Sequence, residues 1–283
     1  MRGHRPGALI VTLYSLYTRD IGSWLSVAAI VQLMSEFGVD AQAVRSAISR
    51  LKRCEVPVLN AERVGGAAGY TMSDDSRVRL DEGNRRIFER RRAAAGEGWI
   101  LAVFSVPEAE REKRAQLRNR LTWLGFGTVT AGVWIAPSHI KYETHDLLTR
   151  TGLDTYVDLF EGSYWDFATL AERVPEWWDL DRLQDQYATF VDDFGPVLAG
   201  YEQRATISEQ EAFTCYTAAM SYWRRLPYIE PGLPLELLPR GWNGILAADM
   251  FAELRERLAA PAHAFFASTR AGQLADGSRR RGA

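Results

Sequence analysis

The sequence of 283 residues is poor in the side chains on which catalytic and metal-binding sites usually depend. Two cysteines, Cys54 and Cys215, are too few for a disulfide framework and are typical of a reducing compartment, so we expect a cytoplasmic protein. Four histidines are scattered along the chain, and none is paired with a cysteine at zinc-ligand spacing. Neither a Gly-x-Ser-x-Gly elbow, a Walker loop nor a dinucleotide fingerprint occurs. We therefore expect no enzyme activity, no catalytic residues, no cofactor and no metal.

Long apolar runs are also absent. No segment approaches the ~20 apolar residues that a membrane-spanning helix needs, so we expect no membrane association. The stretch ALIVTLYSLY follows Arg2 and Arg5 as in a signal peptide, but it lacks a small-residue cleavage site and is followed by Arg19 and Asp20, which predicts a buried helix. Hydrophobic residues make up 47% and charged residues 25% of the chain, which is typical of globular domains. The length predicts more than one domain.

Charge is unevenly distributed along the chain. The net charge is −2, but residues 1–98 contain 15 Lys and Arg against 11 Asp and Glu, whereas residues 99–283 contain 19 against 25. A basic first third in a near-neutral chain indicates a polyanionic partner.

Apolar periodicity divides the chain into five segments and predicts an α+β fold. The first is expected to form three helices and a β-hairpin, with the second helix beginning at Ser23 and ending at Gly38. A charged, partly helical connector follows. The third segment has the order strand, helix, two strands around Gly132, helix and strand, which is a ferredoxin-like β-α-β-β-α-β arrangement. A mostly helical domain and a disordered tail complete the chain. The five segments are 8–73, 74–98, 99–175, 176–266 and 267–283.

The stretch VDAQAVRSAISRLKRCEVPVLNAERVGGAAGY, residues 39–70, contains the most basic predicted helix. Asp40 is a good N-cap for a helix from Ala41 to Arg53, because its carboxylate can accept amide hydrogens of the first turn. Helical spacing places an apolar stripe on one face and polar side chains on the other face or at its flanks. The stripe is Val44, Ala47, Ile48 and Leu51, and the polar set is Gln42, Arg45, Ser46, Ser49, Arg50, Lys52 and Arg53.

A hairpin is predicted directly after this helix, with VPVLNAERV and YTMS as strands and GGAAG as the turn. Three helices and a hairpin in this order are typical of a winged helix-turn-helix, whose third helix enters the major groove while the hairpin lies along the DNA backbone. Arg and Gln make paired hydrogen bonds to guanine and adenine edges, and Ser contacts bases or phosphates. The alternative is that these polar residues only solvate an exposed face. We predict contact with a double-stranded DNA operator through Gln42, Arg45, Ser46, Ser49, Arg50 and Arg53.

Four longer stretches resemble the PaaX family, the repressors of phenylacetic-acid operons. They are FGVDAQAVRSAISRLKR, GNRRIFE, GWILAVFSVPEAEREKRAQLRNRLTWLGFGTVTAGVWIAP and LPLELLPRGWNG, and they occur in the family's order over nearly the whole chain. The resemblance implies a cytoplasmic, usually dimeric transcriptional repressor. It implies an N-terminal winged helix, a central ferredoxin-like domain similar to the CRISPR adaptation nuclease, and a helical C-terminal domain. It also implies release from DNA by an aryl-acetyl-coenzyme A thioester.

Two departures from the family pattern are visible. Family wings often carry a Gly-Arg pair at the tip, where this sequence has GGAA at residues 65–68. Arg63 and Tyr70 are then the nearest groups able to contact phosphate. Glu230-Pro231 replaces the family's common Asp-Pro before its Leu-Pro motif. These departures leave the identity of the effector open.

The resemblance raises a nuclease hypothesis, because the related fold holds a metal with an Asp at the end of its first strand. Here that strand ends VFSVP and offers Ser105, whereas a hard divalent cation prefers carboxylate oxygens. We therefore expect no nuclease activity. The alternatives that stay open are a degenerate nucleic-acid-processing enzyme and a scaffold that binds partners but no DNA.

Two aromatic clusters are candidates for an effector site. MSYWRRLPYIEP places the effector candidates Tyr222, Trp223, Arg224 and Arg225 together, a set able to hold the phosphates and adenine of a coenzyme. Adjacent arginines on a helix, however, often only pair with surface carboxylates. The aromatic residues of SYWDFATLAERVPEWWDL form either an aryl pocket or, as is more frequent, core. They are Tyr164, Trp165, Phe167, Trp177 and Trp178.

Overall fold

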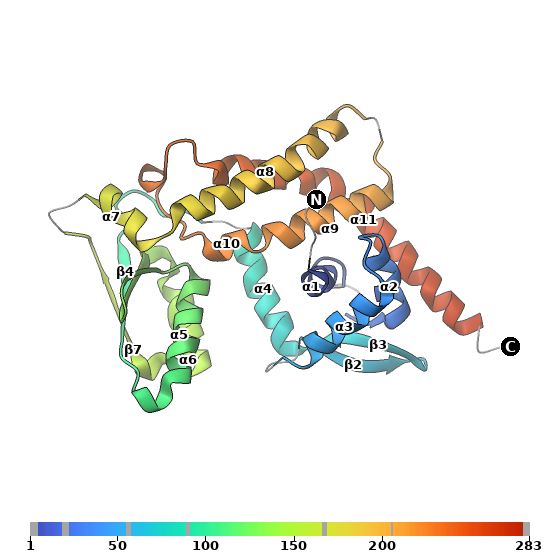
Figure 1. Ribbon diagram of the computed structural model, residues 1–283, viewed down its shortest axis with the longest axis horizontal. Helices are drawn as coiled ribbons and strands as arrows, with labels where there is room; N and C mark the ends of the chain where they lie inside the picture. Colours follow the sequence, from blue (N-terminus) through green and yellow to red (C-terminus); the bar gives the residue numbers. More distant parts are fainter. Residues whose placement is uncertain are drawn as a thin grey trace. The chain divides into compact units, whose positions relative to one another are not determined.

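The computed structural model describes residues 5–18, 23–54, 58–88, 91–165, 169–204 and 206–279. The chain divides into two compact units, each assembled from separate segments (Figure 1). Unit 1 comprises residues 1–85, 190–223 and 246–283, and unit 2 comprises residues 86–189 and 224–245. Helices occur together with two antiparallel sheets, which confirms the predicted α+β class.

The N-terminal part of unit 1 consists of helices and a small antiparallel sheet. The helices are α1 (Pro6–Tyr17), α2 (Val27–Ser35), α3 (Ala41–Lys52) and α4 (Asp74–Phe88). The strands are β1 (Leu25–Ser26), β2 (Leu59–Val64) and β3 (Ala67–Met72), in the order β1-β3-β2. The later part of unit 1 is helical. It contains the C-terminal portion of α8 (Leu180–Glu202), α9 (Glu209–Trp223) and most of α11 (Asn243–Arg279).

The second helix begins later than the sequence predicted. Ser26, not Ser23, is the N-cap of α2, and its Oγ accepts a hydrogen bond from an amide of the first turn at 3.0 Å. Ser23 instead has a left-handed backbone with φ 52°, and its Oγ lies 2.7 Å from Thr71 Oγ1. Trp24 therefore lies outside the helix. The short strand β1, which helical spacing did not reveal, pairs with β3.

The hairpin turn is tighter than the sequence predicted. Only Gly65 and Gly66 form the turn, with φ of 54° and 80°, and residues 67–69 already belong to β3. Positive φ at both central residues suits the right-handed twist of the flanking strands. A Cβ on Gly69 would lie 2.4 Å from the carbonyl oxygen of Leu25, so β1 can approach β3 only over a glycine.

Aromatic rings from α1, α9 and α11 pack together inside unit 1. Tyr17 stacks on Phe266 with ring centroids 4.9 Å apart, and its hydroxyl forms a 2.8 Å hydrogen bond with Thr217. Burial raises the pKa of Tyr17 well above its ordinary value. Phe213 contacts the rings of both Tyr17 and Phe37, at 5.5 and 5.6 Å. These contacts join the N-terminal helices to α9 and α11.

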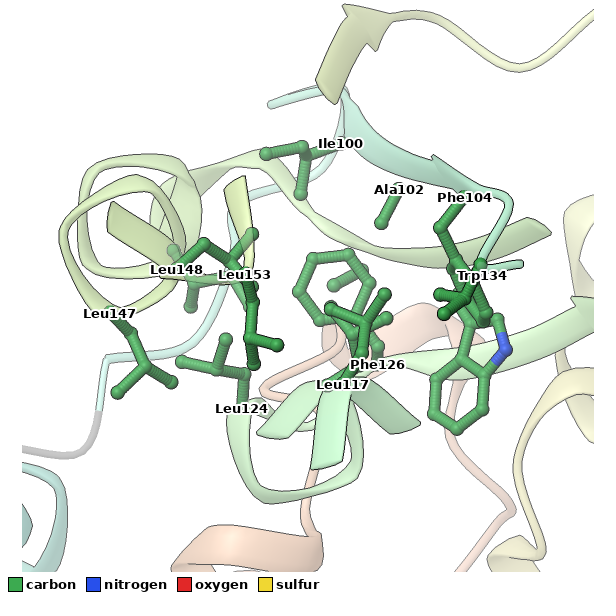
Figure 2. Packing of buried hydrophobic residues seen from close by; sticks show 14 residues of the cluster. Ile100, Ala102, Phe104, Leu117, Leu124, Phe126, Trp134, Leu147, Leu148 and Leu153 are labelled. Carbon is green, nitrogen blue, oxygen red and sulfur yellow. The ribbon is translucent and has the colours of Figure 1, made fainter. Parts of the chain in front are cut away.

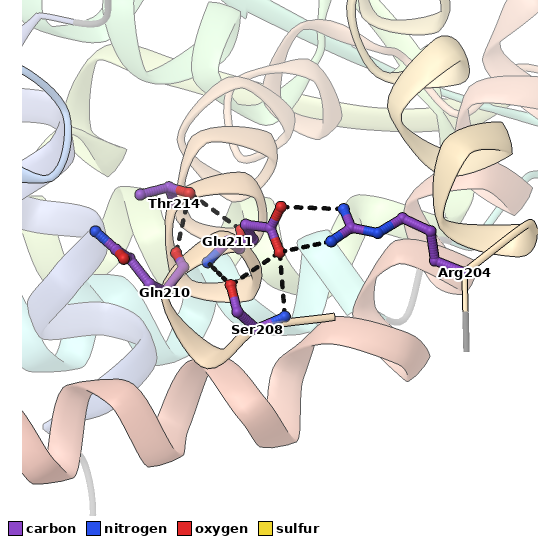
Figure 3. Close-up of polar contacts among 5 residues, drawn as sticks. All are labelled: Arg204, Ser208, Gln210, Glu211 and Thr214. Carbon is purple, nitrogen blue, oxygen red and sulfur yellow. Dashed lines mark hydrogen bonds and ion pairs between the residues drawn. The ribbon is translucent and has the colours of Figure 1, made fainter. Parts of the chain in front are cut away.

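The N-terminus of α9 is held by a set of polar contacts (Figure 3). Ser208 Oγ accepts the Glu211 amide hydrogen, and the Glu211 carboxylate accepts the Ser208 amide hydrogen, each at 3.2 Å, which is a capping box. Arg204 donates two hydrogen bonds to the same carboxylate, at 3.0 and 3.1 Å. The hydrogen bonds from Arg204, and then those from Ser208, lower the pKa of Glu211 to about 2. Gln210 donates to the Glu36 carboxylate at 2.6 Å and so connects α9 to the end of α2.

Unit 2 is built on a four-stranded antiparallel sheet with the strand order β5-β6-β4-β7. Along the chain its elements are β4 (Trp99–Phe104), α5 (Arg111–Leu124), β5 (Gly127–Thr130), β6 (Val133–Pro137), α6 (Lys141–Thr151) and β7 (Val157–Gly162). Figure 2 shows the core, in which leucines of α5 and α6 pack against Ile100, Ala102 and Phe104 of β4. Both helices therefore cover the same face of the sheet.

The remaining elements of unit 2 are short, apart from the first part of α8. They are α7 (Leu170–Trp177), α10 (Leu226–Ile229) and the 3-10 turns η2 (Glu108–Glu110), η3 (Ser138–Ile140), η4 (Asp154–Tyr156) and η5 (Leu235–Leu237). Trp177 and Trp178 are buried against Trp99, with ring centroids 6.2 Å away in each case, so both belong to the core. Trp165 is 96% exposed, and Phe167 lies outside the described residues.

A buried ion pair fixes the segment around Glu230 inside unit 2. Arg92 donates to the Glu230 carboxylate at 2.7 Å and to the Leu233 carbonyl at 2.9 Å, and the Tyr187 hydroxyl donates to the other carboxylate oxygen. The Glu230 side chain is 3% exposed and that of Arg92 is 23% exposed. The glutamate that departs from the family pattern thus holds two elements together.

Three further findings concern the whole chain. Helix α11 runs to Arg279, so residues 267–279 are helical where disorder was expected, and residues 280–283 lie outside the described part.

Both cysteines are free thiols. Cys54 is exposed, whereas Cys215 is buried and burial raises its pKa to about 11. Within the described residues, no helix has the length and apolar character needed to cross a membrane.

Candidate nucleic-acid interface

The start of α3 is fixed by the predicted N-cap. Asp40 Oδ1 accepts hydrogen bonds from the amides of Gln42 and Ala43, both at 2.8 Å. These bonds satisfy donors that the helix itself leaves unpaired, and they place the acidic side chain at the positive end of the helix dipole. The first polar side chain of the predicted interface, Gln42, therefore extends from a well-defined turn.

The two faces of α3 differ as the sequence predicted. Val44, Ala47 and Ile48 are at most 2% exposed, and Leu51 at the edge of the stripe is half-buried. The helix packs against α1 and α2 through this stripe. Ser49 is half-buried on the other side. The exposed polar residues there are Gln42, Arg45, Ser46, Arg50, Lys52 and Arg53. The polar residues predicted to contact base edges thus lie on α3 or, in the case of Arg53, at its C-cap, and most are open to solvent.

The hairpin lies next to the C-terminal end of α3 within unit 1 (Figure 1). Arg63 on β2 is exposed and lies 3.5 Å from the Gly66 carbonyl, at the limit of a hydrogen bond. Tyr70 on β3 is half-buried, and its backbone carbonyl accepts a 2.8 Å hydrogen bond from Tyr14. The Lys52 ammonium group lies 5.5 Å from the centroid of the Tyr70 ring, within the range of a cation–π contact.

The contact between Lys52 and Tyr70 was missed by the sequence-based prediction. Helical spacing placed Lys52 only at the flank of the polar face, and no spacing rule relates a helix residue to a strand 18 positions later. The contact brings together the helix and the strand that carry the predicted DNA contacts. The same hairpin exposes Glu62, which opposes phosphate binding beside Arg63.

The four effector candidates have unlike surroundings. Trp223 is 1% exposed and stacks on Phe251, with ring centroids 4.8 Å apart and an interplanar angle of 13°. Tyr222 and Arg224 are half-buried, and Arg225 is exposed. The packing of Trp223 favours a structural role for that ring. The effector role of the four residues stays a prediction.

Comparisons with known proteins cover most of the chain. Residues 5–76 match the family described as PaaX-like protein, residues 92–174 match the PaaX protein central Cas2-like domain, and residues 178–268 match the PaaX-like protein C-terminal domain. The chain is 26% identical over 262 residues to the transcriptional repressor PaaX of Escherichia coli strain K12, with 91% of this chain and 82% of that protein covered.

A solved structure has a similar fold. It is an uncharacterized protein from Mycobacterium tuberculosis with a TM-score of 0.57 and 22% sequence identity, and the match covers 91% of this chain and 97% of that one. This likeness concerns the fold alone. The three family matches succeed one another along nearly the whole chain, and the chain therefore belongs to the PaaX family.

Proposed function

We propose that this protein is a sequence-specific DNA-binding transcriptional regulator that represses a catabolic operon. The observation that carries the proposal is the polar, solvent-open face of α3, which lies opposite the buried stripe of Val44, Ala47 and Ile48. The name of the Escherichia coli relative, transcriptional repressor PaaX, supports the direction of regulation.

The proposed reading of the N-terminal segment is a winged helix-turn-helix over residues 8–73. In this proposal α3 enters the major groove, and Arg45 or Gln42 pairs with base edges. Arg63 and Tyr70, on the hairpin, contact the phosphate backbone. The separation of roles has a physical basis, since side chains on a rigid helix reach bases in a defined register, while a hairpin with few basic residues supplies only modest phosphate affinity.

Selection of binding sites from random DNA duplexes, followed by titration of the selected duplex, tests the proposal. An Arg45→Ala, Ser49→Ala, Arg53→Ala variant should lose most of its preference for the selected duplex over a scrambled one. The matched control is Arg111→Ala, Arg118→Ala, which removes the same two positive charges from the exposed face of α5. Equal binding by wild type and the α3 variant would contradict the proposal.

We propose that the protein binds its operator as a homodimer on an inverted repeat, with half-sites roughly 10 base pairs or a multiple of that apart. One helix and one wing with so few basic groups contact few phosphates, and a second copy of the chain doubles the number of these contacts. Sedimentation of the saturated complex should give two chains per operator. One chain per operator at saturation would exclude the dimer.

We also propose that an acyl-coenzyme A thioester is the effector that weakens DNA binding, with Tyr222, Trp223, Arg224 and Arg225 as candidate contacts. A ligand shifts the DNA-bound state only if it binds the released state more tightly, and a hundredfold preference is worth ~2.7 kcal/mol. Calorimetric titration with phenylacetyl-coenzyme A, using wild type and an Arg224→Ala, Arg225→Ala variant, is the test. Equal binding by both proteins would exclude the arginines, and no binding would exclude this thioester.

For residues 99–175 we propose a ferredoxin-like domain without catalytic activity. The element order, the antiparallel strand order β5-β6-β4-β7 and the match to a Cas2-like domain support the fold. The exposed Ser105 at the end of β4 offers a hydroxyl where a metal site needs a carboxylate, which supports the absence of activity. Cleavage of single- or double-stranded DNA by purified protein with Mg²⁺ or Mn²⁺, abolished by EDTA, would contradict this proposal.

A further inference from the structure

Unit 2 contains a cavity of about 300 Å³ that the DNA-binding proposal does not use. Residues from four parts of the chain line it: residues 93–99, Pro137 at the end of β6, Ser163, Tyr164 and Leu170 after β7, and Pro234, Glu236 and Leu237. The buried residues of the lining are Trp99, Ala93, Pro137 and Pro234. Ala94, Ala95, Gly96, Ser163 and Glu236 are exposed and form its rim. None of the four effector candidates lines this cavity.

The aromatic wall of the cavity is fixed by packing. Trp99 contacts Trp177 and Trp178, and Tyr164 makes an edge contact with Trp177 at 5.7 Å and 70°. Each ring is thus held by another ring behind it. Such a wall needs little rearrangement to receive a flat apolar ligand, which lowers the entropic cost of binding.

The connector part of the lining has small side chains, and hydrogen bonds to its backbone hold it in place. Residues 93–98 read AAAGEG, so few side-chain atoms fill the space. The amide of Ala93 donates to the Gly232 carbonyl at 2.9 Å, and the Ser138 hydroxyl donates to the Glu97 carbonyl at 2.9 Å. The cavity therefore exists because the connector has small side chains and is anchored at both ends.

The size and charge of the lining restrict the ligand. A cavity of ~150 Å³ lined by apolar side chains is enough to bind benzene, so about 300 Å³ suits a two-ring or substituted aromatic group. The lining residues named by the structure include two carboxylates, Glu97 and Glu236, and no Lys or Arg. The Glu97 carboxylate accepts hydrogen bonds from the Arg91 guanidinium group and from the Ala94 amide. The exposed Glu236 is therefore the carboxylate that gives the mouth its negative charge.

We propose that this cavity binds an uncharged aromatic group of about two rings and discriminates against aromatic carboxylates. Trp99 and Tyr164 provide the apolar contact, and Glu236 repels an anionic substituent at the mouth. The proposal does not depend on DNA binding, and DNA binding does not depend on it.

Two-dimensional NMR of the full chain with labelled alanine methyl groups tests this directly, because Ala93 and Ala94 lie in the lining. 2-Naphthol is the uncharged probe and 2-naphthoate the anionic one. For a ligand of this size we expect a dissociation constant on the order of 0.1–1 mM for 2-naphthol, with saturable shifts of these two methyl signals. The affinity for 2-naphthoate should be at least tenfold lower.

Variants separate the two parts of the proposal. Ala95→Phe fills the mouth and should weaken 2-naphthol binding at least tenfold, whereas Ala115→Phe on the exposed face of α5 is the matched control and should not. Glu236→Gln should raise the affinity for 2-naphthoate about fivefold and leave that for 2-naphthol unchanged. No saturable shift with 2-naphthol, or equal binding by the two phenylalanine variants, would overturn the site. Equal affinity of wild type for both probes would overturn the charge selectivity.

Discussion

Replacing Arg92 by Met should destabilise unit 2 strongly. The substitution keeps much of the side chain's apolar stem but removes the cation that pairs with Glu230, whose side chain is only 3% exposed. Removing one member of a buried ion pair costs about 3–5 kcal/mol, which is a large fraction of the total stability of a domain. Tyr187 still donates one hydrogen bond to the carboxylate but cannot replace the positive charge.

The opposite substitution, Glu230→Gln, should be milder. Arg92 is 23% exposed, so water can solvate part of the guanidinium group, and the amide oxygen of Gln can still accept a hydrogen bond. We expect a loss of about 1–2 kcal/mol. The asymmetry between the two variants follows from the unequal exposure of the two partners.

Urea unfolding followed by tryptophan fluorescence measures both losses, since Trp178 and Trp242 are buried in the same unit. The Arg92→Met, Glu230→Leu double variant removes the buried charge altogether. It should therefore recover a large part of the loss caused by Arg92→Met. Equal losses for the two single variants, or losses below about 0.5 kcal/mol for both, would show that the unequal burial of the two charges does not determine the stability of unit 2.

Three further predictions concern unit 1. Gly69→Ala places a methyl group 2.4 Å from the Leu25 carbonyl oxygen, which should cost about 3 kcal/mol of stability and abolish operator binding. Thermal unfolding and DNA titration measure the two effects, and an unchanged melting temperature would contradict this prediction. Asp40→Ala removes the cap of α3 and should cost about 1 kcal/mol in urea unfolding, whereas Asp40→Asn should retain most of that stability. Because the pKa of Glu211 is lowered to about 2, chiefly by Arg204, its contribution to stability is complete above about pH 4.5 and is lost as the pH falls toward 2. An acid titration followed by circular dichroism should therefore show a smaller loss of stability in Glu211→Gln than in wild type, and identical acid profiles would contradict this assignment.

Local patterns were sufficient to predict several elements. The N-cap at Asp40 and the buried face of α3 followed from a capping residue before an apolar stripe with helical period, and both are confirmed. The apolar run from Trp99 ended by Pro107 predicted a strand, which the structure places at β4. These features depend on residues close together in sequence, so propensity and spacing describe them well.

Features that depend on distant residues were not predictable in the same way. Ser23 and Ser26 are both acceptable N-caps, and the choice between them is made by the pairing of β1 with β3 across Gly69. The packing of Trp223 was not indicated by its neighbours in sequence, because the ring on which it stacks, Phe251, is 28 positions away. The cavity beside Trp99 needs four separate parts of the chain to converge. No local pattern indicates these contacts.

If α3 reads base edges in an operator, a position-by-position titration reveals which base pair Arg45 contacts. Each base pair of the selected operator is changed in turn, and the affinities of wild type and Arg45→Ala are compared for every duplex. We expect Arg45→Ala to lose about 1–3 kcal/mol of binding free energy and to relax specificity at one base position, with the other positions discriminated as before. A uniform loss across all duplexes would show that Arg45 contacts only the backbone, and unchanged affinities would contradict the claim that this face of α3 binds DNA.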